Sequence, residues 1–313
     1  MLKLYITVLY WFSLLAGLLV PSLALYGQET KIFTTKDYDL EGRVKNCLVL
    51  TNYGREEFEF NRDSNLVKAV TRFNAKDYSI TMYKYKNGQL VERRDEVYRD
   101  GTFDANTSMA HFFKADTLKG NMITEQILNY NKQLIDRYEY FYDEEERLSR
   151  IVRSSPEGVD ETRVEYSEQK GETTTSYFLN EVLLKSIRES TRKAKDGTGH
   201  RVILTKEYIK GVPDKALEAS YDANGKLLSE IYFEYSGANK TFVRGKNISY
   251  EYGERGMLKS VRTQEGGQTE TKNYIFQFDS LGNWTKQIIT PENAYTTRKI
   301  EYFPEPADDT DGN

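Results

Sequence analysis

A recurring heptapeptide constrains the fold of this chain more than any other feature. Tyr or Phe is followed directly by Asp or Asn at eight places, and at five of them Leu, Val or Trp stands six positions after the aromatic residue. Leu, Val and Trp make up 45 of the 313 residues, so chance predicts about one such coincidence in eight. The five heptapeptides are YDLEGRV from Tyr38, FNRDSNL from Phe60, YDEEERL from Tyr142, YDANGKL from Tyr221 and FDSLGNW from Phe278.

The composition of the heptapeptide is typical of a β-hairpin reversal. The Asp or Asn side chain can accept hydrogen bonds from the turn backbone, and Gly or Asn tolerates the positive φ that a tight reversal needs. The aromatic residue then ends one strand, and the aliphatic residue begins the return strand. YGERGML at 252–258 keeps the spacing with Gly in place of Asp, and YKNGQL from Tyr85 and FLNEVL from Phe178 are shortened versions.

The residues before these turns alternate in character. A second aromatic residue stands two positions before the turn aromatic, and polar residues lie between and beside the two rings. A period of two places each aromatic pair on one face of a strand and the polar residues on the other, which predicts an antiparallel meander with one aromatic-aliphatic face and one charged face. The aromatic pairs are Phe58/Phe60, Tyr83/Tyr85, Tyr140/Tyr142, Tyr250/Tyr252 and Phe276/Phe278, and the opposite residues are Glu57, Glu59, Lys84, Glu251 and Gln277.

These residues resemble a known group of repeats. YDANGKL and FDSLGNW look like the YD repeats of the Rhs family. The alternative resemblance is to MORN-variant proteins, because YKNGQLVER is similar to their short repeats. The resemblance covers 38–303. It implies an all-β fold, an antiparallel meander of YD-type hairpin repeats that forms a long curled sheet or partial shell. In the Rhs family such shells belong to bacterial surface or exported proteins, and carbohydrate binding is often suggested for them.

The ends of the chain indicate export. A short basic start, an apolar run and small residues before position 25 are typical of a secretory signal peptide over 1–24. An uncleaved inner-membrane anchor over residues 4–25 is the alternative. We expect a lead-in at 25–37, the repeat domain at 38–303 and a disordered acidic tail at 304–313.

Two internal segments are harder to interpret. Residues 104–128 break the rhythm of the heptapeptides, and they are equally compatible with a short helix and with an excursion between strands. Residues 190–200 are charged and contain glycine, which predicts a long hairpin loop.

Few residue types offer catalytic or metal chemistry. Cys47 is the single cysteine and lies in an apolar, strand-like run, so we expect a buried hydrophobic residue and no intramolecular disulfide. His111 and His200 are the only histidines, and they lack both metal-ligand spacing and a nucleophile elbow. We therefore expect no cofactor and no metal. The net charge of −4, with signs interspersed, argues against a nucleic-acid partner.

These observations predict an exported, non-catalytic protein that acts as a cell-envelope scaffold or a binding module for a glycan or protein ligand. The expected location is the periplasm, the outer envelope or the extracellular space, with membrane contact only through an unprocessed N-terminal segment. Core packing accounts for most of the aromatic face, and the candidates for ligand stacking on any open part are Tyr140, Tyr250, Tyr252 and Trp284. A carboxylate-dependent glycoside hydrolase and a small Rhs-type shell associated with a toxin system are the alternatives.

Overall fold

Four of the five heptapeptides form hairpin turns in the computed structural model, which describes residues 31–116, 121–193 and 197–305. At YDANGKL, Oδ1 of Asp222 accepts hydrogen bonds from the backbone N–H groups of Asn224 (2.9 Å) and Lys226 (2.8 Å). Gly225 takes a φ of +81°, which glycine adopts without strain. The same two bonds recur at Asn61, Asp143 and Asp279. The short polar side chain therefore organises each turn, as the sequence predicts.

The strands between these turns follow one another along the chain as an antiparallel meander. The first ten are β1 (Val44–Leu50), β2 (Arg55–Phe60), β3 (Leu66–Arg72), β4 (Tyr78–Lys86), β5 (Gln89–Arg99), β6 (Thr102–Phe103), β7 (Met109–Asp116), β8 (Met122–Asn129), β9 (Leu134–Tyr142) and β10 (Leu148–Ser155). The others are β11 (Gly158–Gln169), β12 (Glu172–Leu179), β13 (Val182–Lys193), β14 (Gly199–Ile209), β15 (Val212–Tyr221), β16 (Leu227–Ser236), β17 (Thr241–Tyr252), β18 (Leu258–Glu265), β19 (Gln268–Phe278), β20 (Trp284–Thr290) and β21 (Ala294–Tyr302). Two short 3₁₀ helices, η2 (Thr35–Tyr38) and η3 (Glu254–Gly256), complete the described elements.

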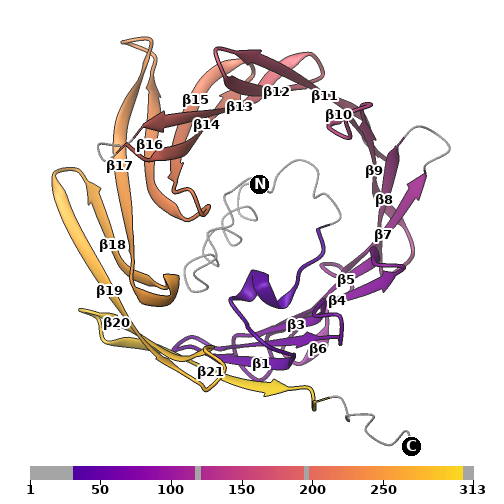
Figure 1. Cartoon of the computed structure of the whole chain (residues 1–313). Coiled ribbons are helices and arrows are strands. Elements are labelled where there is room, and N and C mark those ends of the chain that lie inside the picture. Colours follow the sequence, from indigo (N-terminus) through magenta and orange to yellow (C-terminus); the bar gives the residue numbers. More distant parts are fainter. Residues whose placement is uncertain (1–30, 117–120, 194–196, 306–313) are drawn as a thin grey trace, which may run out of the picture.

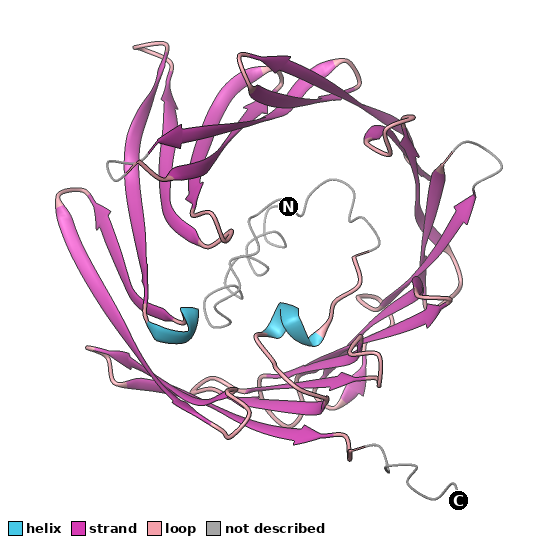
Figure 2. Ribbon diagram, in the orientation of Figure 1, coloured by secondary structure: helices cyan, strands magenta, loops and turns pink. Residues whose placement is uncertain are grey.

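The sheet closes into a barrel (Figures 1 and 2). β1 pairs with β2 on one side and with β21 on the other, where Cys47 lies opposite Ile300 and Leu50 opposite Thr297. Within the described residues β6 pairs only with β5, so 20 of the 21 strands form the ring. The expectation of an open curled sheet or partial shell is therefore wrong. Twist of constant hand brings the first strand to the last, and their pairing satisfies two otherwise open edges.

The aromatic face of the meander lines the inside of the barrel. Helix η2 lies within the ring (Figure 1), and its Tyr38 ring packs against Phe58 with centroids 4.6 Å apart. Cross-strand partners share a face, so the strand registers carry this inward side around the ring from Phe58. The five aromatic pairs of the sequence all point inward, and Glu57, Glu59, Lys84, Glu251 and Gln277 all point outward. The predicted two-faced meander is confirmed.

The two ends of the barrel carry different turns. In a meander, successive turns alternate between the two ends, and the turns at 61–65, 143–147, 222–226 and 279–283 all fall at one of them. We call this end the Asx rim, after its Asp and Asn side chains. The opposite rim carries the turns between β1 and β2, β3 and β4, β8 and β9, and the alternate hairpins up to β20 and β21.

The first heptapeptide does not form a hairpin. Tyr38 ends helix η2, and Asp39 takes the left-handed conformation at its C-terminus with φ +51°. The segment that follows is held inside the ring by Leu40, which is 2% exposed and packs in a cluster with Val44 and Cys47. The prediction of a hairpin at 38–44 is therefore wrong, because the residues directly before Asp39 form helix η2 and not a strand, and the segment packs against the inner wall.

The segments that the sequence left open are strands. Residues 109–116 and 122–129 form β7 and β8, and the detour lies before them, at 100–108 around the short β6. The expected long loop at 190–200 is shorter, because β13 runs to Lys193 and β14 begins at Gly199. Residues 1–24, the expected signal peptide, residues 25–30 of the lead-in and residues 306–313 of the tail lie outside the described residues. In the described ranges, no helix has the length and apolar character needed to cross a membrane.

Candidate functional site

The inner wall of the barrel is the candidate functional site, because all four predicted ligand-binding residues lie on it. Tyr140 in β9 and Trp284 in β20 are buried, with 4% and 5% of their surface exposed. Tyr250 and Tyr252 in β17 are half-buried. Strands β9 and β17 stand on opposite sides of the ring (Figure 1), so the structure places only Tyr250 and Tyr252 side by side.

Tyr140 belongs to a buried polar cluster. Its hydroxyl donates to Oε2 of Glu125 at 2.8 Å, and Oε1 of the same carboxylate lies 2.7 Å from Nδ1 of His111. The other ring nitrogen of His111, Nε2, lies 3.4 Å from Oδ2 of Asp95 and 2.9 Å from a guanidinium nitrogen of Arg93. Cross-strand pairs Arg93–His111 and Glu125–Tyr138 bring these side chains together from β5, β7, β8 and β9. The Tyr140 hydroxyl, the Glu125 carboxylate and both ring nitrogens of His111 therefore each have a polar partner.

The charges of the cluster shift its protonation. Burial disfavours the charged imidazole, but hydrogen bonds with Asp95 and Glu125 outweigh it, so the pKa of His111 is raised. Burial also opposes ionisation of Asp95, yet its hydrogen bond with His111 and the charge of Arg93 lower the pKa of that carboxyl. Burial and the neighbouring Glu125 charge raise the pKa of Tyr140. The two carboxylates therefore favour the charged imidazole within the wall, and the charge of Arg93 opposes it in part.

A second tyrosine–glutamate pair lies on the other side of the ring. The hydroxyl of Tyr250 donates to Oε2 of Glu230 at 2.6 Å, and Glu230 is 5% exposed. Tyr232 also faces inward, opposite Leu217, and is 37% exposed. Burial and the Glu230 charge raise the pKa of Tyr232 to about 12. The Tyr252 hydroxyl donates to the carbonyl of Leu227 at 2.8 Å. This part of the wall thus offers half-buried and exposed rings beside a carboxylate.

Trp284 is covered by a cation. The guanidinium of Arg298 stacks on the indole ring, with its Cζ 3.6 Å from the ring centroid. Burial lowers the pKa of Arg298, and the carboxylates of Asp39 and Glu56 oppose this change. In the described part of the chain, Nε and Nη1 of Arg298 are buried without a hydrogen-bond partner. Trp284 is therefore part of the packed inner wall.

Residues 33–43, the segment that lies inside the ring before β1, are anchored at the Asx rim. The side chain of Asn283 accepts a hydrogen bond from the backbone N–H of Glu41 (2.7 Å) and donates to its carbonyl (2.9 Å), and it is 1% exposed. The Tyr302 hydroxyl donates to Asp279, the Asx residue of the same turn, at 2.5 Å. At the other end of the segment, Leu66 donates its N–H to the Phe33 carbonyl at 2.8 Å. The bonds of Asn283 and Leu66 hold this segment against the turn before β20 and against β3.

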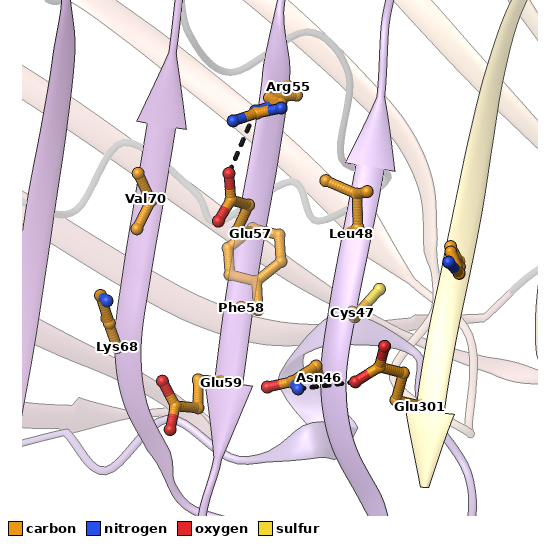
Figure 3. Close-up of a pocket in the computed structure, with 11 residues that line it drawn as sticks. Asn46, Cys47, Leu48, Arg55, Glu57, Phe58, Glu59, Lys68, Val70 and Glu301 are labelled. Atoms are coloured by element: carbon orange, nitrogen blue, oxygen red, sulfur yellow. Dashed lines mark hydrogen bonds and ion pairs between the residues drawn. The ribbon is translucent and has the colours of Figure 1, made fainter.

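The outer surface has a different character. A depression of about 420 Å³ lies over β1, β2, β3 and β21 and is open and lined mostly by charged side chains (Figure 3). Arg55 and Glu57 form an ion pair there with Nε and Oε1 3.1 Å apart, and Asn46 donates to Glu301 at 2.9 Å. Such exposed pairs contribute little to stability. None of the four predicted ligand-binding residues lines this depression.

Sequence reasoning missed the inward acids. It expected strand carboxylates to alternate opposite the aromatic residues, yet Glu125 and Glu230 are on the inner face beside Tyr140 and Tyr250. Glu230 stands three residues after Leu227 of the heptapeptide, which strict alternation would place on the opposite face. A bulge beside Ser220 and Tyr221 of β15 adds one residue to β16 after Leu227, so Leu227 and Glu230 lie on the same face. Cys47 is 2% exposed, as its apolar neighbours predict.

Comparisons with known proteins identify no relative. No protein-family model and no curated protein matches the chain. Among solved structures, the chain is similar to a porin-like protein from Bacteroides uniformis (10% identity, TM-score 0.32, 87% of this chain and 100% of that one) and to a porin-like protein from Bacteroides vulgatus (10%, 0.24, 84% and 100%). It is also similar to TcdB2-TccC3 without its hypervariable C-terminal region (15%, 0.21), where it covers 85% of this chain and 17% of that one. TM-scores this low assign neither a family nor a function.

Proposed function

We propose that the protein is an exported, non-catalytic binding module of the cell envelope that holds a glycan chain against the aromatic inner wall of its barrel. The observation that carries the proposal is the orientation of the sheet, which places the aromatic pairs of the repeat on the inner face and their mostly charged neighbours on the outer face. Binding sites combine apolar and aromatic surface with a few placed polar groups, and the wall around Tyr250, Tyr232 and Glu230 has this composition. The apolar N-terminal run of the sequence supports export.

Closure of the barrel favours a glycan over an extended peptide. A peptide strand commonly binds by adding its backbone to an open sheet edge. Here β1 and β21 pair with each other, so among the described strands only the two-residue β6 keeps an unpaired edge. A sugar chain needs instead ring faces for its C–H surfaces and side-chain polar groups for its hydroxyls, which the wall supplies.

The charges on the outer face of the barrel indicate that this face is surrounded by water and not by lipid. A barrel that spans a lipid bilayer carries an outward apolar band about 25 Å tall. In this barrel the outward positions of β2 are Arg55, Glu57 and Glu59, and those of β21 include Lys299 and Glu301. Charges at these strand positions would be costly against lipid.

The state of the inward acids supports a non-catalytic role over the glycoside-hydrolase alternative. Glu125 is shared between Tyr140 and His111, and Glu230 is held by Tyr250. A general acid or nucleophile must reach the substrate within hydrogen-bond distance. Carboxylates that are about 5% exposed and already engaged serve better to position the rings beside them.

The experiment is a glycan array with the full chain, followed by calorimetry on the best ligand. We expect Tyr232→Ala to weaken binding at least about tenfold, which corresponds to about 1.4 kcal/mol. Tyr295→Ala is the matched control, because Tyr295 is 62% exposed but lies on the outer face. Failure of every arrayed glycan to bind, or equal losses in the two variants, would overturn the proposal.

A further inference from the structure

The rim opposite the Asx rim carries a ring of exposed apolar side chains. Among the described residues, fourteen large apolar side chains are strongly exposed. Leu281 lies at the Asx rim, and Tyr232 and Ile275 lie within strands; the other eleven stand in the turns of the opposite rim or within three residues of them. We call this end the apolar rim. Its eleven residues are Leu50, Tyr53, Phe73, Leu134, Ile135, Val159, Val182, Ile209, Val212, Val243 and Tyr295.

The apolar residues are contiguous on at least two neighbouring hairpins. Ile209 and Val212 are cross-strand partners beside one turn, and they are 61% and 59% exposed. A Cβ atom placed on Gly211 of that turn would lie 3.5 Å from Cγ1 of Val182, which belongs to the next hairpin and is 46% exposed. Exposed apolar surface gathered in one place on a protein is typical of an interaction site, whereas single exposed residues are not.

The charges of the rim select the kind of partner. The hairpin tips beyond the apolar residues are charged, with Lys210 and Lys240 of one sign and Glu157, Glu181 and Glu265 of the other. Insertion into a bilayer would bury these tips first, at about 3 kcal/mol for each charge near the centre. The mixed signs also give no basic excess for anionic lipid headgroups. A second copy of the same surface, related by a two-fold axis, can place one sign of charge opposite the other around the apolar residues.

We propose that the apolar rim is the interface through which a second copy of this chain docks, rim to rim, about a two-fold axis. In such an interface the same patch serves both copies, and the acidic tips Glu157 and Glu181 can face the basic tips Lys210 and Lys240 of the other copy. Among the described strands only the two-residue β6 keeps an unpaired edge, so the contact is made mainly by side chains of the turns. Docking in this way would join two aromatic-lined barrels end to end.

Sedimentation of the full chain tests the proposal directly. We expect a species of twice the 36.4 kDa chain mass for the wild type, and the monomer for the double variant Ile209→Glu/Val212→Glu. Leu281→Glu is the matched control at the Asx rim, since Leu281 is 53% exposed, and this variant should remain dimeric. Circular dichroism and thermal unfolding establish that each variant is folded.

Three results would overturn the proposal. One is a monomeric wild type at tens of micromolar, and another is a dimer that survives the double variant. The third is flotation of the wild type with neutral phosphatidylcholine vesicles that is lost in the double variant and kept in Leu281→Glu, which would assign the rim to a membrane surface. None of these results depends on whether the inner wall binds a glycan.

Discussion

Two walls of the barrel contain the same tyrosine–glutamate bond in different surroundings. In the β8–β10 wall, Glu125 lies opposite Tyr138 and bonds diagonally to Tyr140. In the β15–β17 wall, Glu230 lies opposite Ile248 and bonds diagonally to Tyr250. The shared register of the repeat therefore places the two residues within reach of each other in both walls.

The third partner makes the difference between the two walls. His111 closes the other side of the Glu125 carboxylate and links it to Asp95, so the first pair is part of a buried charge network. Beside Glu230 stands Tyr232, which is 37% exposed. The register of the repeat therefore determines the tyrosine–glutamate bond in both walls. The side chains of the neighbouring strands determine whether that bond is buried in a charge network or lies beside an exposed ring that a ligand can reach.

Replacing each of the two glutamates should give the largest difference in stability between the two walls. We expect Glu125→Ala to lower the free energy of unfolding by about 3–5 kcal/mol, because it leaves His111 and Tyr140 buried without their acceptor. Glu230→Ala should cost less, about 1–3 kcal/mol, because water can reach the hydroxyls near the exposed Tyr232. Urea denaturation measures both. The outward Glu251→Ala should change little, and equal losses at Glu125 and Glu230 would refute the distinction.

The second-largest difference between the two walls should be in how stability depends on pH. The pKa of His111 is raised above its ordinary value of 6.5, so its protonated form contributes stability that is complete below pH 6.5 and is lost as the pH rises through the folded-state pKa. The effect should be smaller than that of Glu125→Ala, because deprotonation leaves every side chain in place.

Unfolding free energies measured from pH 6 upward test this prediction. His111→Gln should flatten the fall in stability, while Glu230→Gln should keep it, since the second wall contains no histidine. An unchanged slope in His111→Gln would contradict the role given to this network.

The turns beside the two walls should show the smallest effects. Glu146 in the first wall and Gly225 in the second occupy the same heptapeptide position, with φ of +60° and +81°. A non-glycine residue in this conformation is strained by about 1 kcal/mol, so Glu146→Gly should raise the unfolding free energy by about that amount and Gly225→Ala should lower it. A destabilising Glu146→Gly would show that the glutamate side chain outweighs the strain.

The sequence predicted the local structure because its signals are local. Asp222 bonds to backbone groups two and four residues away, so YDANGKL contains all that its turn requires. The alternation of Tyr250 and Tyr252 with Glu251 predicted the two faces in the same way. Tyr38-Asp39 has the same letters and was predicted wrongly, because a turn forms a hairpin only where a strand precedes it.

The candidate site was predicted only in part. Tyr140, Tyr250, Tyr252 and Trp284 were expected on one face, and they share it, but their exposure depends on neighbours distant in sequence. Arg298 covers Trp284, and Asn283 holds a segment 242 residues away. No spacing within the chain reports such contacts.

The amino-acid order alone determined where the chain reverses and which side chains alternate, since both depend on residues within a few positions of one another. Only the tertiary structure decided that β1 pairs with β21 and that the aromatic face is the inner one. That outcome depends on twist summed over the whole meander and on edges about 250 residues apart, whose pairing is favourable only once every strand between them is in place.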